Sequence, residues 1–412
     1  MKDISKIEYH RKTCLMCGSE LKSEPLMILE NMPRSAQDIP DEDEVSADSG
    51  IELRLFKCED CGLYQFDCEP VSYYRDVIRA VGLSETMRNL RRSDYAYMIE
   101  KYGLSGKRFL ECGCGRGEFL EVLSEFPVEV YGTENNAEFA ESAKKTIGED
   151  RIISSFPETE NDIFFGGDFD CFLSFNFLEH QPHPKVMLRS MYNNLKNGGY
   201  GLITVPSFEY ILKEGRYYEL IRDHIANYSL DTLIRLCRDC GFEILESGYI
   251  GIGDTLRVVV RKAKTVGATK ASGAEETEEL KRLTENYVLI KSAVKEFTDE
   301  LENEGKRLCL WGAGHQGFTI ASTTTLSQRA AYILDSAPFK QGRFAPASHI
   351  PIVAPEHFKD DPCDAILIVA PGYAKEINET IKRSFGNLKD KNGADINPPE
   401  VFKLSSDRIE KM

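Results

Sequence analysis

The sequence predicts an α/β protein in which a small cysteine-rich module is followed by two doubly wound α/β units. Two Cys-x-x-Cys-Gly motifs lie within the first 62 residues. An apolar stretch, a glycine-rich turn and a helical pattern follow one another at 108–123, and a similar succession begins at 307. Strand, glycine turn and helix form the opening unit of a doubly wound, Rossmann-like sheet. Because 412 residues exceed one ordinary hydrophobic core, we expect a metal-binding module at 1–80, α/β units at 81–262 and 306–412, and a linker and helix at 263–305.

The composition excludes several classes of protein. Hydrophobic residues make up 42% of the chain and charged residues 29%, as in globular proteins that fold in water. A formal net charge of −16 would repel a phosphate backbone, so we expect no nucleic-acid partner. No stretch approaches the ~20 apolar residues of a membrane span, and residues 1–14 lack a signal-peptide core. We therefore expect a cytoplasmic protein without a membrane partner, whose 12 cysteines are reduced.

Four of the cysteines have the spacing of metal ligands. Cys14 and Cys17 precede a glycine, and Cys58 and Cys61 repeat the same pattern. In each motif the glycine allows the turn that brings backbone amides to the sulfurs, and two such turns supply four thiolates in a tetrahedron. The alternative is free cysteines at coincidental spacing. We predict a structural zinc ion, because four thiolates leave no open coordination position for chemistry.

The glycine-rich turn of the first α/β unit predicts a nucleotide cofactor. Gly113, Gly115 and Gly117 allow the backbone to approach a ligand closely, although nicotinamide enzymes use similar turns. The neighbouring acids distinguish the cofactors. Glu111 lies on the first strand, where it can meet a methionine ammonium group, and Glu134 ends the next strand, where an acid accepts hydrogen bonds from both ribose hydroxyls. This pair favours S-adenosylmethionine.

Two later strands complete the expected cofactor site. Strand 151–156 ends at Phe156, near the expected adenine, and strand 170–176 ends at Asn176, which Phe177 follows. Open α/β sheets bind their ligands at such carboxyl ends. The stretch Asn-Phe-Leu-Glu-His at 176–180 resembles a signature of class I methyltransferases. We therefore predict a class I (Rossmann-like) methyltransferase domain that uses S-adenosylmethionine.

The chain as a whole resembles the nucleotide-sugar C-methyltransferases, which methylate carbon 3 of a 4-keto sugar. The resemblance covers the paired cysteine motifs, the methyltransferase core and the C-terminal part. In the C-terminal part it is carried by the segments Leu310-Trp-Gly-Ala-Gly314, Tyr332-Ile-Leu-Asp335, Lys340-Gln-Gly-Arg-Phe344, Ile350-Pro-Ile352 and Ala365-Ile-Leu-Ile-Val-Ala370. It implies a small-molecule substrate and a monomer or homodimer.

The resemblance also implies the catalytic residues. In that family a Glu-His pair after the fifth strand acts with an upstream histidine in proton transfer. Asp223 and His224 match the pair, and His180 matches the upstream histidine. Imidazole titrates near neutrality, so His224 can take a proton from the carbon beside a carbonyl while a carboxylate orients it. We expect His224 as the general base, Asp223 as its orienting group, and His180 as the residue that steadies the enolate or relays the proton.

The chain departs from the family's pattern at three places. Ile221 stands where an aromatic hydroxyl normally precedes the Glu-His pair, 77–81 replaces a stretch rich in tyrosine, and 252–257 lacks the histidine of a His-Gly-Gly-Ser-Leu-Arg motif. Tyr217 and Tyr218 are candidates to replace the lost hydroxyl, and we expect Tyr218 to bind the substrate. These departures leave open whether carbon or oxygen is methylated.

The C-terminal third predicts a long helix and a second nucleotide-type fold. The helical pattern runs from 277 to about 304, and its apolar stripe contains Leu280, Leu283, Val288, Leu289, Ala293 and Val294. Lys262 to Glu276 has the composition of a linker. After the turn at 312–314, Asp335 ends a strand where a nicotinamide enzyme would hold ribose. An oxidoreductase is thus a rival interpretation. The residues after the third glycine, Phe318 and Thr319 after Gly317, do not support it.

We expect this second unit to close over the substrate. His315, Lys340 and Arg343 are the candidates to meet the substrate's phosphates. The leading hypothesis is a C-methyltransferase acting on a nucleotide-linked keto sugar. The alternatives are O-methylation of a sugar or other small metabolite with the same cofactor, and a zinc-ribbon binding protein whose methyltransferase domain is inactive.

Overall fold

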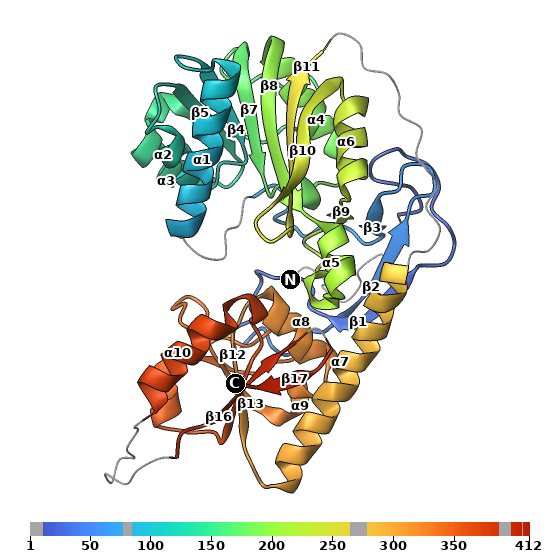
Figure 1. Ribbon diagram of the computed structural model, residues 1–412, viewed down its shortest axis with the longest axis vertical. Coiled ribbons are helices and arrows are strands. Elements are labelled where there is room, and N and C mark those ends of the chain that lie inside the picture. The colour runs from blue at the N-terminus through green and yellow to red at the C-terminus, as the bar shows by residue number, and fades with distance from the viewer. Residues whose placement is uncertain (1–10, 77–84, 264–277, 387–396, 406) are drawn as a thin grey trace.

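The computed structural model describes residues 11–76, 85–263, 278–386, 397–405 and 407–412, and three β-sheets lie in these ranges (Figure 1). Two sheets form separate upper and lower bodies in Figure 1, and the small N-terminal sheet, in blue, lies at the level between them. The predicted linker after Ala263 and the segment 77–81 lie outside the described residues.

The N-terminal sheet combines residues from two distant parts of the chain. Its first three strands are antiparallel neighbours: β1 (Met27–Met32), β2 (Ile51–Lys57) and β3 (Tyr64–Phe66). The fourth strand, β9 (Ala226–Asn227), comes from the middle of the chain and pairs antiparallel with β3. The predicted domain boundary between residues 80 and 81 stays a prediction. A strand from the C-terminal side of this boundary completes the N-terminal sheet.

The central sheet has seven strands in the order β10-β11-β8-β7-β4-β5-β6. Their bounds are β4 (Arg108–Cys112), β5 (Glu129–Glu134), β6 (Ile152–Ser154), β7 (Phe169–Phe175), β8 (Leu195–Pro206), β10 (Phe242–Ile250) and β11 (Thr255–Lys262). Strands β6, β5, β4, β7 and β8 run parallel, and β11 is antiparallel to both of its neighbours. The strand order reverses between β4 and β7, and ligands of open α/β sheets bind at this switch point.

Helices cover both faces of the central sheet. One core contains side chains of α1 (Glu85–Tyr102), α2 (Glu118–Leu123) and α3 (Ala137–Ile147), and the other contains those of α4 (Pro184–Asn194) and α6 (Leu230–Asp239). Side-chain hydrogen bonds cap the first turn of two of these helices. The Asn136 side chain accepts hydrogen bonds from two amides of the first turn of α3, and Ser229 with Thr232 forms a capping box at α6.

The C-terminal sheet is the second doubly wound unit, with the order β14-β13-β12-β15-β16-β17. Its strands are β12 (Leu308–Trp311), β13 (Ala330–Leu334), β14 (Ile352–Val353), β15 (Ala365–Ile368), β16 (Glu400–Leu404) and the antiparallel β17 (Ile409–Lys411). Its helices are α8 (His315–Thr323), α9 (Leu326–Arg329) and α10 (Ala374–Phe385). The predicted α/β fold class, with two Rossmann-like sheets and an N-terminal cysteine module, is confirmed.

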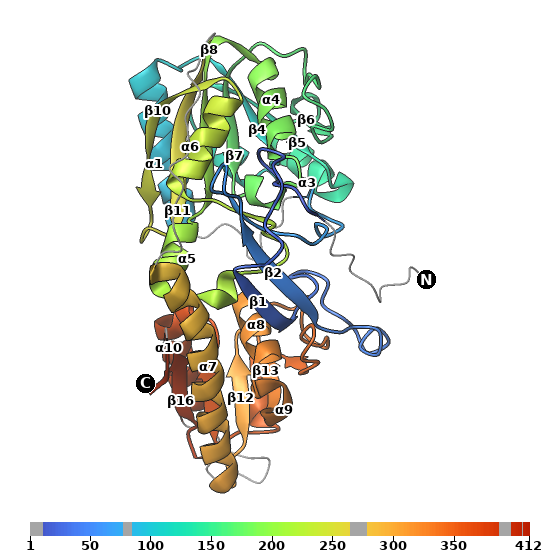
Figure 2. The same cartoon turned by 90° about the vertical axis from the view of Figure 1, so that its right-hand side faces the viewer.

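The long helix α7 (Glu278–Asn303) runs along the C-terminal body and reaches α5 (Phe208–Glu214) (Figure 2). A single core joins its buried face with the N-terminal sheet, α5 and the C-terminal sheet. The predicted apolar stripe was wrong at two positions. Val288 and Leu289 are 59% and 49% exposed. The buried face contains Leu280, Leu283 and Val294 of the predicted stripe, and Ile290 and Phe297 in addition.

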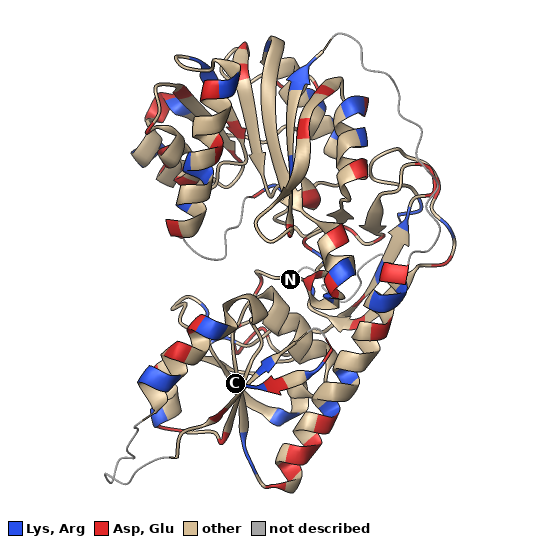
Figure 3. Cartoon of the chain, viewed as in Figure 1, with Lys and Arg blue, Asp and Glu red and all other residues tan. Residues whose placement is uncertain are grey.

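Acidic and basic residues are interspersed along the surface helices, as Figure 3 shows for α7 and α10. None of the helices in the described ranges has both the length and the apolar character needed to cross a membrane.

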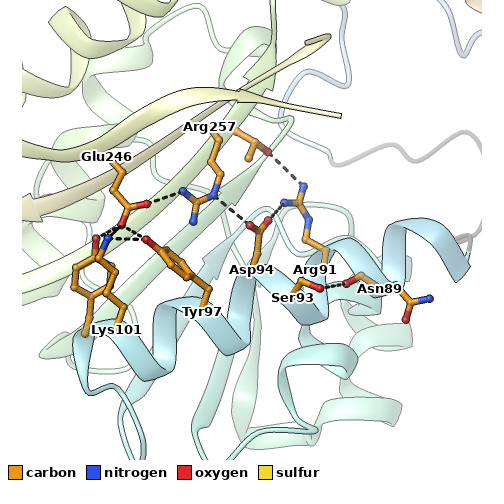
Figure 4. A network of polar contacts seen from close by, with 10 residues as sticks. Asn89, Arg91, Ser93, Asp94, Tyr97, Lys101, Glu246 and Arg257 are labelled. Carbon is orange, nitrogen blue, oxygen red and sulfur yellow. Dashed lines mark hydrogen bonds and ion pairs between the residues drawn. The ribbon is translucent and has the colours of Figure 1, made fainter. Parts of the chain in front are cut away.

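A polar network fastens α1 to the edge strand β10 and its neighbour β11 (Figure 4). Arg257 donates to Asp94 of α1 at 3.2 Å and to Glu246 of β10 at 3.1 Å. Lys101 donates to Glu246 at 2.7 Å, and the Tyr102 hydroxyl donates to the same carboxylate. Burial raises the pKa of Glu246, but hydrogen bonds from Lys101, Tyr102 and Arg257 outweigh this effect and lower the pKa to about 2.

Arg91 extends this network to the ligand end of the sheet. The side chain is 2% exposed, and its guanidinium lies 3.8 Å from the ring centroid of Phe175. It pairs with Asp94 at 3.3 Å and donates to the Thr204 hydroxyl at 3.4 Å (Figure 4). Because Phe175 and Thr204 lie at the carboxyl ends of β7 and β8, α1 is anchored where ligands of such sheets bind.

Replacing Glu246 by glutamine should lower the free energy of unfolding by about 1–2 kcal/mol near pH 7. A hydrogen bond to a charged group contributes about 1.5–3 kcal/mol, and partial exposure of the carboxylate reduces this value. The folded-state pKa is depressed, so the contribution is present above the ordinary value of about 4.3 and is lost as the pH falls toward about 2. Urea denaturation across this pH range tests the prediction. Glu243→Gln, on the same strand but more exposed, should cost less, and a constant Glu246→Gln deficit down to pH 2 would contradict it.

Candidate functional site

The four predicted metal ligands lie together. The Sγ atoms of Cys14 and Cys61 are 3.4 Å apart, as are those of Cys17 and Cys58, and all four sulfurs lie within 4.8 Å of one another. Zinc–sulfur bonds of about 2.3 Å place the sulfurs of a tetrahedral site roughly 3.8 Å apart. The cluster therefore has the size and composition of a four-thiolate metal site.

The two cysteine turns have the same backbone geometry. Gly18 and Gly62 adopt φ values of 79° and 82°, in the left-handed region that favours glycine. Their amides donate to the carbonyl oxygens of Cys14 and Cys58 at 3.0 and 2.9 Å. A side chain at Gly62 would also contact Thr232 of α6, so this turn packs against the central unit.

The glycine turn after β4 is built around the carboxylate of Glu134. Gly113, Gly115 and Gly117 all have positive φ values, of 75°, 57° and 86°. The Gly115 amide donates to Glu134 Oε2 at 2.8 Å, and the Asn136 amide donates to Oε1 at 2.9 Å. Glu134 is fully buried, as is Glu111 on the neighbouring strand. The turn thus brings two carboxylates and a glycine backbone to the carboxyl edge of β4 and β5.

The ends of β6 and β7 contribute the other predicted cofactor residues. Asn176 is exposed and has a φ of 48°, an uncommon conformation for a residue other than glycine. It follows β7, and its side chain accepts a hydrogen bond from the Thr204 hydroxyl at 3.1 Å. Phe177 is buried and packs edge-on against Phe156, with ring centroids 6.1 Å apart. Backbone strain of this kind clusters at functional sites.

The three predicted catalytic residues also lie together. The rings of His180 and His224 are edge to face, with centroids 5.0 Å apart. His180 Nδ1 is 2.8 Å from the Asp223 carbonyl oxygen. A carbonyl can only accept, so Nδ1 carries the proton and Nε2 of the neutral ring carries the lone pair. The segment that follows α5 thus delivers Asp223 and His224 to the end of β7, where His180 lies in the short helix Leu178–His180.

Burial controls the protonation of this cluster. It lowers the pKa of His180, although the Asp223 charge raises it, and lowers that of His224 well below the ordinary value, with a further decrease from the His180 charge. Burial also raises the pKa of the neighbouring Glu179 to about 8. Both imidazoles are therefore neutral near pH 7.

Tyr73 is a member of this site that the sequence did not reveal. Its hydroxyl donates to Asp223 Oδ1 at 2.6 Å, while the Ala36 amide donates to Oδ2 at 3.0 Å. Burial, and then the Asp223 charge, raise the pKa of Tyr73 well above its usual range. An aromatic hydroxyl thus contacts the acid although Ile221 replaces the expected one. Tyr73 and Asp223 are 150 positions apart, and the only sequence signal was the Tyr-Tyr pair at 73–74.

A small pocket next to Asp223 is lined by three parts of the chain. Met32 and Ala36 come from the N-terminal module, Ile221 and Asp223 from the segment after α5, and His315 from the start of α8. His315 Nε2 lies 3.0 Å from a carboxylate oxygen of Glu219. The structure therefore brings His315 to the same pocket as Asp223.

The remaining predicted substrate residues make contacts within the protein. Lys340 is buried, donates to the Ala313 carbonyl at 2.7 Å and lies 3.6 Å from Asp335. Arg343 donates to the Ile39 carbonyl at 2.8 Å. Tyr218 is buried beside Tyr217, whose hydroxyl lies 3.0 Å from the Thr323 hydroxyl.

Two family models match consecutive parts of the chain. A methyltransferase domain matches residues 83–247, and a C-methyltransferase C-terminal domain matches residues 256–388. Together they cover nearly all of the central sheet and the strands β12 to β15 of the C-terminal sheet, whereas β16 and β17 lie beyond the second match.

Curated relatives and solved structures show similarity of different extent. The C-methyltransferase NovU of Streptomyces niveus is 22% identical over 408 residues, which cover 91% of this chain and 93% of NovU. The ubiquinone biosynthesis O-methyltransferase of Marinobacter nauticus is 27% identical over 113 residues, and the match spans 26% of this chain and 48% of that protein. A methyltransferase structure from Aquifex aeolicus matches 42% of this chain and 93% of its own, with 20% identity and a TM-score of 0.34.

The order of the two matched domains and the near full-length match to one relative identify the class of enzyme. The chain is an S-adenosylmethionine-dependent methyltransferase whose C-terminal part matches the C-methyltransferase C-terminal domain.

Proposed function

We propose that the enzyme methylates the carbon beside the carbonyl group of a nucleotide-linked keto sugar. The observation that carries this proposal is the cluster of His180, His224 and Asp223, with the Tyr73 hydroxyl bound to the acid. Methylation of carbon requires removal of a proton from that carbon, and a positioned imidazole is suited to this step. The C-methyltransferase NovU, to which the chain is similar over most of its length, supports carbon as the acceptor.

In this proposal His224 takes the proton and leaves an enolate on the substrate. His180, held by the Asp223 carbonyl, steadies the enolate oxygen or relays the proton. Asp223 acts as a positioning residue, because its two carboxylate oxygens are bound by Tyr73 and the Ala36 amide and its backbone orients His180.

The residues at the carboxyl edge fit S-adenosylmethionine. Glu134 presents a buried carboxylate that accepts the Gly115 and Asn136 amides, at the strand end where an acid accepts hydrogen bonds from ribose hydroxyls. Glu111 would meet the ammonium group, and the glycine turn would lie along the ligand. Phe156, Asn176 and Phe177 would complete the site near the adenine. When bound, the cofactor supplies an electrophilic methyl group.

For the reacting part of the substrate we propose the region beside Asp223, where His315 lines the small pocket. Tyr218 is the further proposed contact, and it is buried beside Tyr217, outside the lining of this pocket. Lys340 and Arg343 would have to leave their present carbonyl partners to reach a phosphate.

We also propose that the four cysteines hold one structural zinc ion. Cys58→Ser should abolish stoichiometric zinc and destabilise the N-terminal module, since metal binding and folding are coupled in small metal sites. Cys68→Ala is the matched control, because Cys68 is buried in the same module but lies outside the cluster. Elemental analysis of purified protein gives the zinc content. A wild-type protein without zinc, or a Cys58→Ser variant with a full equivalent, would contradict the assignment.

Glu134→Gln should weaken binding of S-adenosylmethionine by about 1.5–3 kcal/mol, the value of one charge-assisted hydrogen bond. The amide retains one acceptor oxygen and places an NH₂ group against a backbone N–H. Calorimetry measures the change. Glu138→Gln is the control, because Glu138 is an exposed residue of the following helix. Equal affinities of wild type and Glu134→Gln would show that the cofactor lies elsewhere.

His224→Asn should lower turnover about 10²- to 10⁴-fold, the usual contribution of general-base catalysis, and leave cofactor affinity nearly unchanged. His183→Asn, at an exposed histidine three positions after His180, should retain activity. If Asp223→Asn loses a comparable factor, the double variant should lose little more, because residues that act as a unit are not additive.

Exchange of substrate hydrogen with deuterated water separates the two methylation classes. The wild type should exchange the hydrogen beside the carbonyl, and His224→Asn should not, because the imidazole removes that proton before methyl transfer. Turnover without exchange in the wild type would favour O-methylation by positioning alone.

A further inference from the structure

A second group of possible metal ligands lies in the catalytic cluster. Glu179, His180 and His224 each offer one ligand atom, and these atoms lie within 4.8 Å of one another. His180 Nε2 is 3.9 Å from Glu179 Oε1. Two imidazoles and one carboxylate are a recurrent ligand set for divalent transition metals.

The orientation of His180 is the one found at metal sites. Its Nδ1 donates to the Asp223 carbonyl at 2.8 Å, so the Nε2 lone pair faces Glu179. Metal-binding histidines almost always donate their other ring N–H to a carbonyl or carboxylate, which fixes the tautomer and the ring orientation.

Glu179 supplies an independent observation. The residue is 2% exposed, and its Oε2 has no hydrogen-bond partner among the described residues. A buried carboxylate oxygen without a hydrogen-bond partner is costly, and a cation bound to it would offset that cost. Glu179 is not used by the proposed methyl transfer, so its position next to two histidines is otherwise unexplained.

We propose that Glu179, His180 and His224 form a second metal site, which takes one divalent first-row transition-metal ion. Bonds of about 2.0–2.2 Å to nitrogen and oxygen require small side-chain rotations to draw the three atoms together. The His180 side chain is 21% exposed, so the site has contact with solvent for entry of the ion and for water ligands. Its nitrogen and oxygen donors distinguish it from the cysteine cluster.

Occupation of this site would affect the reaction. An ion bound to His224 uses the lone pair that proton removal needs, so it should inhibit turnover. This consequence rests on the proposed function, whereas the metal site itself does not.

Cobalt(II) added to protein that already holds one zinc ion tests the site. The wild type should bind one further equivalent, with weak visible absorption and without the strong near-ultraviolet bands of cobalt–thiolate bonds. Glu179→Gln and His180→Asn should each weaken this binding at least about tenfold. Glu209→Gln, at a half-buried carboxylate far from the cluster in sequence, should bind cobalt like the wild type.

Absence of a further cobalt equivalent, cobalt–thiolate bands in place of the weak absorption, or unchanged binding in both folded variants would each overturn the metal site. Circular dichroism confirms that the variants are folded. Cobalt bound at the expected residues without loss of turnover would leave the metal site in place and overturn His224 as the base. The two proposals therefore fail separately.

Discussion

The pairing of β9 with β3 is the constraint on which the rest of the site depends. Tyr64 pairs with Asn227 and Gln65 with Ala226, and the Phe66 amide donates to the Ile225 carbonyl at 3.0 Å. Asp223 and His224 lie just before this strand, so their backbone is held against the N-terminal module. The His224 ring contacts His180 at the end of β7, and the Asp223 carboxylate binds Tyr73. The cysteine turns belong to the module that supplies β3 and Tyr73, so they are connected to the proposed catalytic residues through this pairing.

In both doubly wound sheets a carboxylate accepts a backbone amide of the glycine turn. In the central sheet Glu134 accepts the Gly115 amide at 2.8 Å, and in the C-terminal sheet Asp335 accepts the Ala313 amide at 2.8 Å. In the second case a buried lysine lies 3.6 Å from the acid and donates to the carbonyl of the same turn. A protein cation thus occupies the neighbourhood of an acid that a nicotinamide enzyme would offer to ribose, which argues against the oxidoreductase interpretation.

Local signals predicted the fold class and the approximate ends of the strands, because glycine turns, apolar strands and cysteine spacing depend on residues that are close together in the sequence. Contacts between distant segments were not accessible in this way. The Tyr73 hydroxyl on Asp223 spans 150 positions, and Asp48, in a loop that its acidic composition marks as exposed, accepts the Ala347 amide across 299 positions. Likewise, the inward direction of Lys340 depends on packing between elements, and composition alone favours a surface lysine.

The origin of β9 in the middle of the chain has a consequence for biosynthesis. Strand β3 ends at Phe66, and its partner begins at Ala226, so a ribosome must add about 160 residues before the sheet can be completed, on the order of ten seconds at typical elongation rates. During this interval the nascent module exposes an open strand edge, which is prone to pairing with other chains. Early binding of zinc by the two cysteine turns would keep the N-terminal module folded until β9 leaves the ribosome.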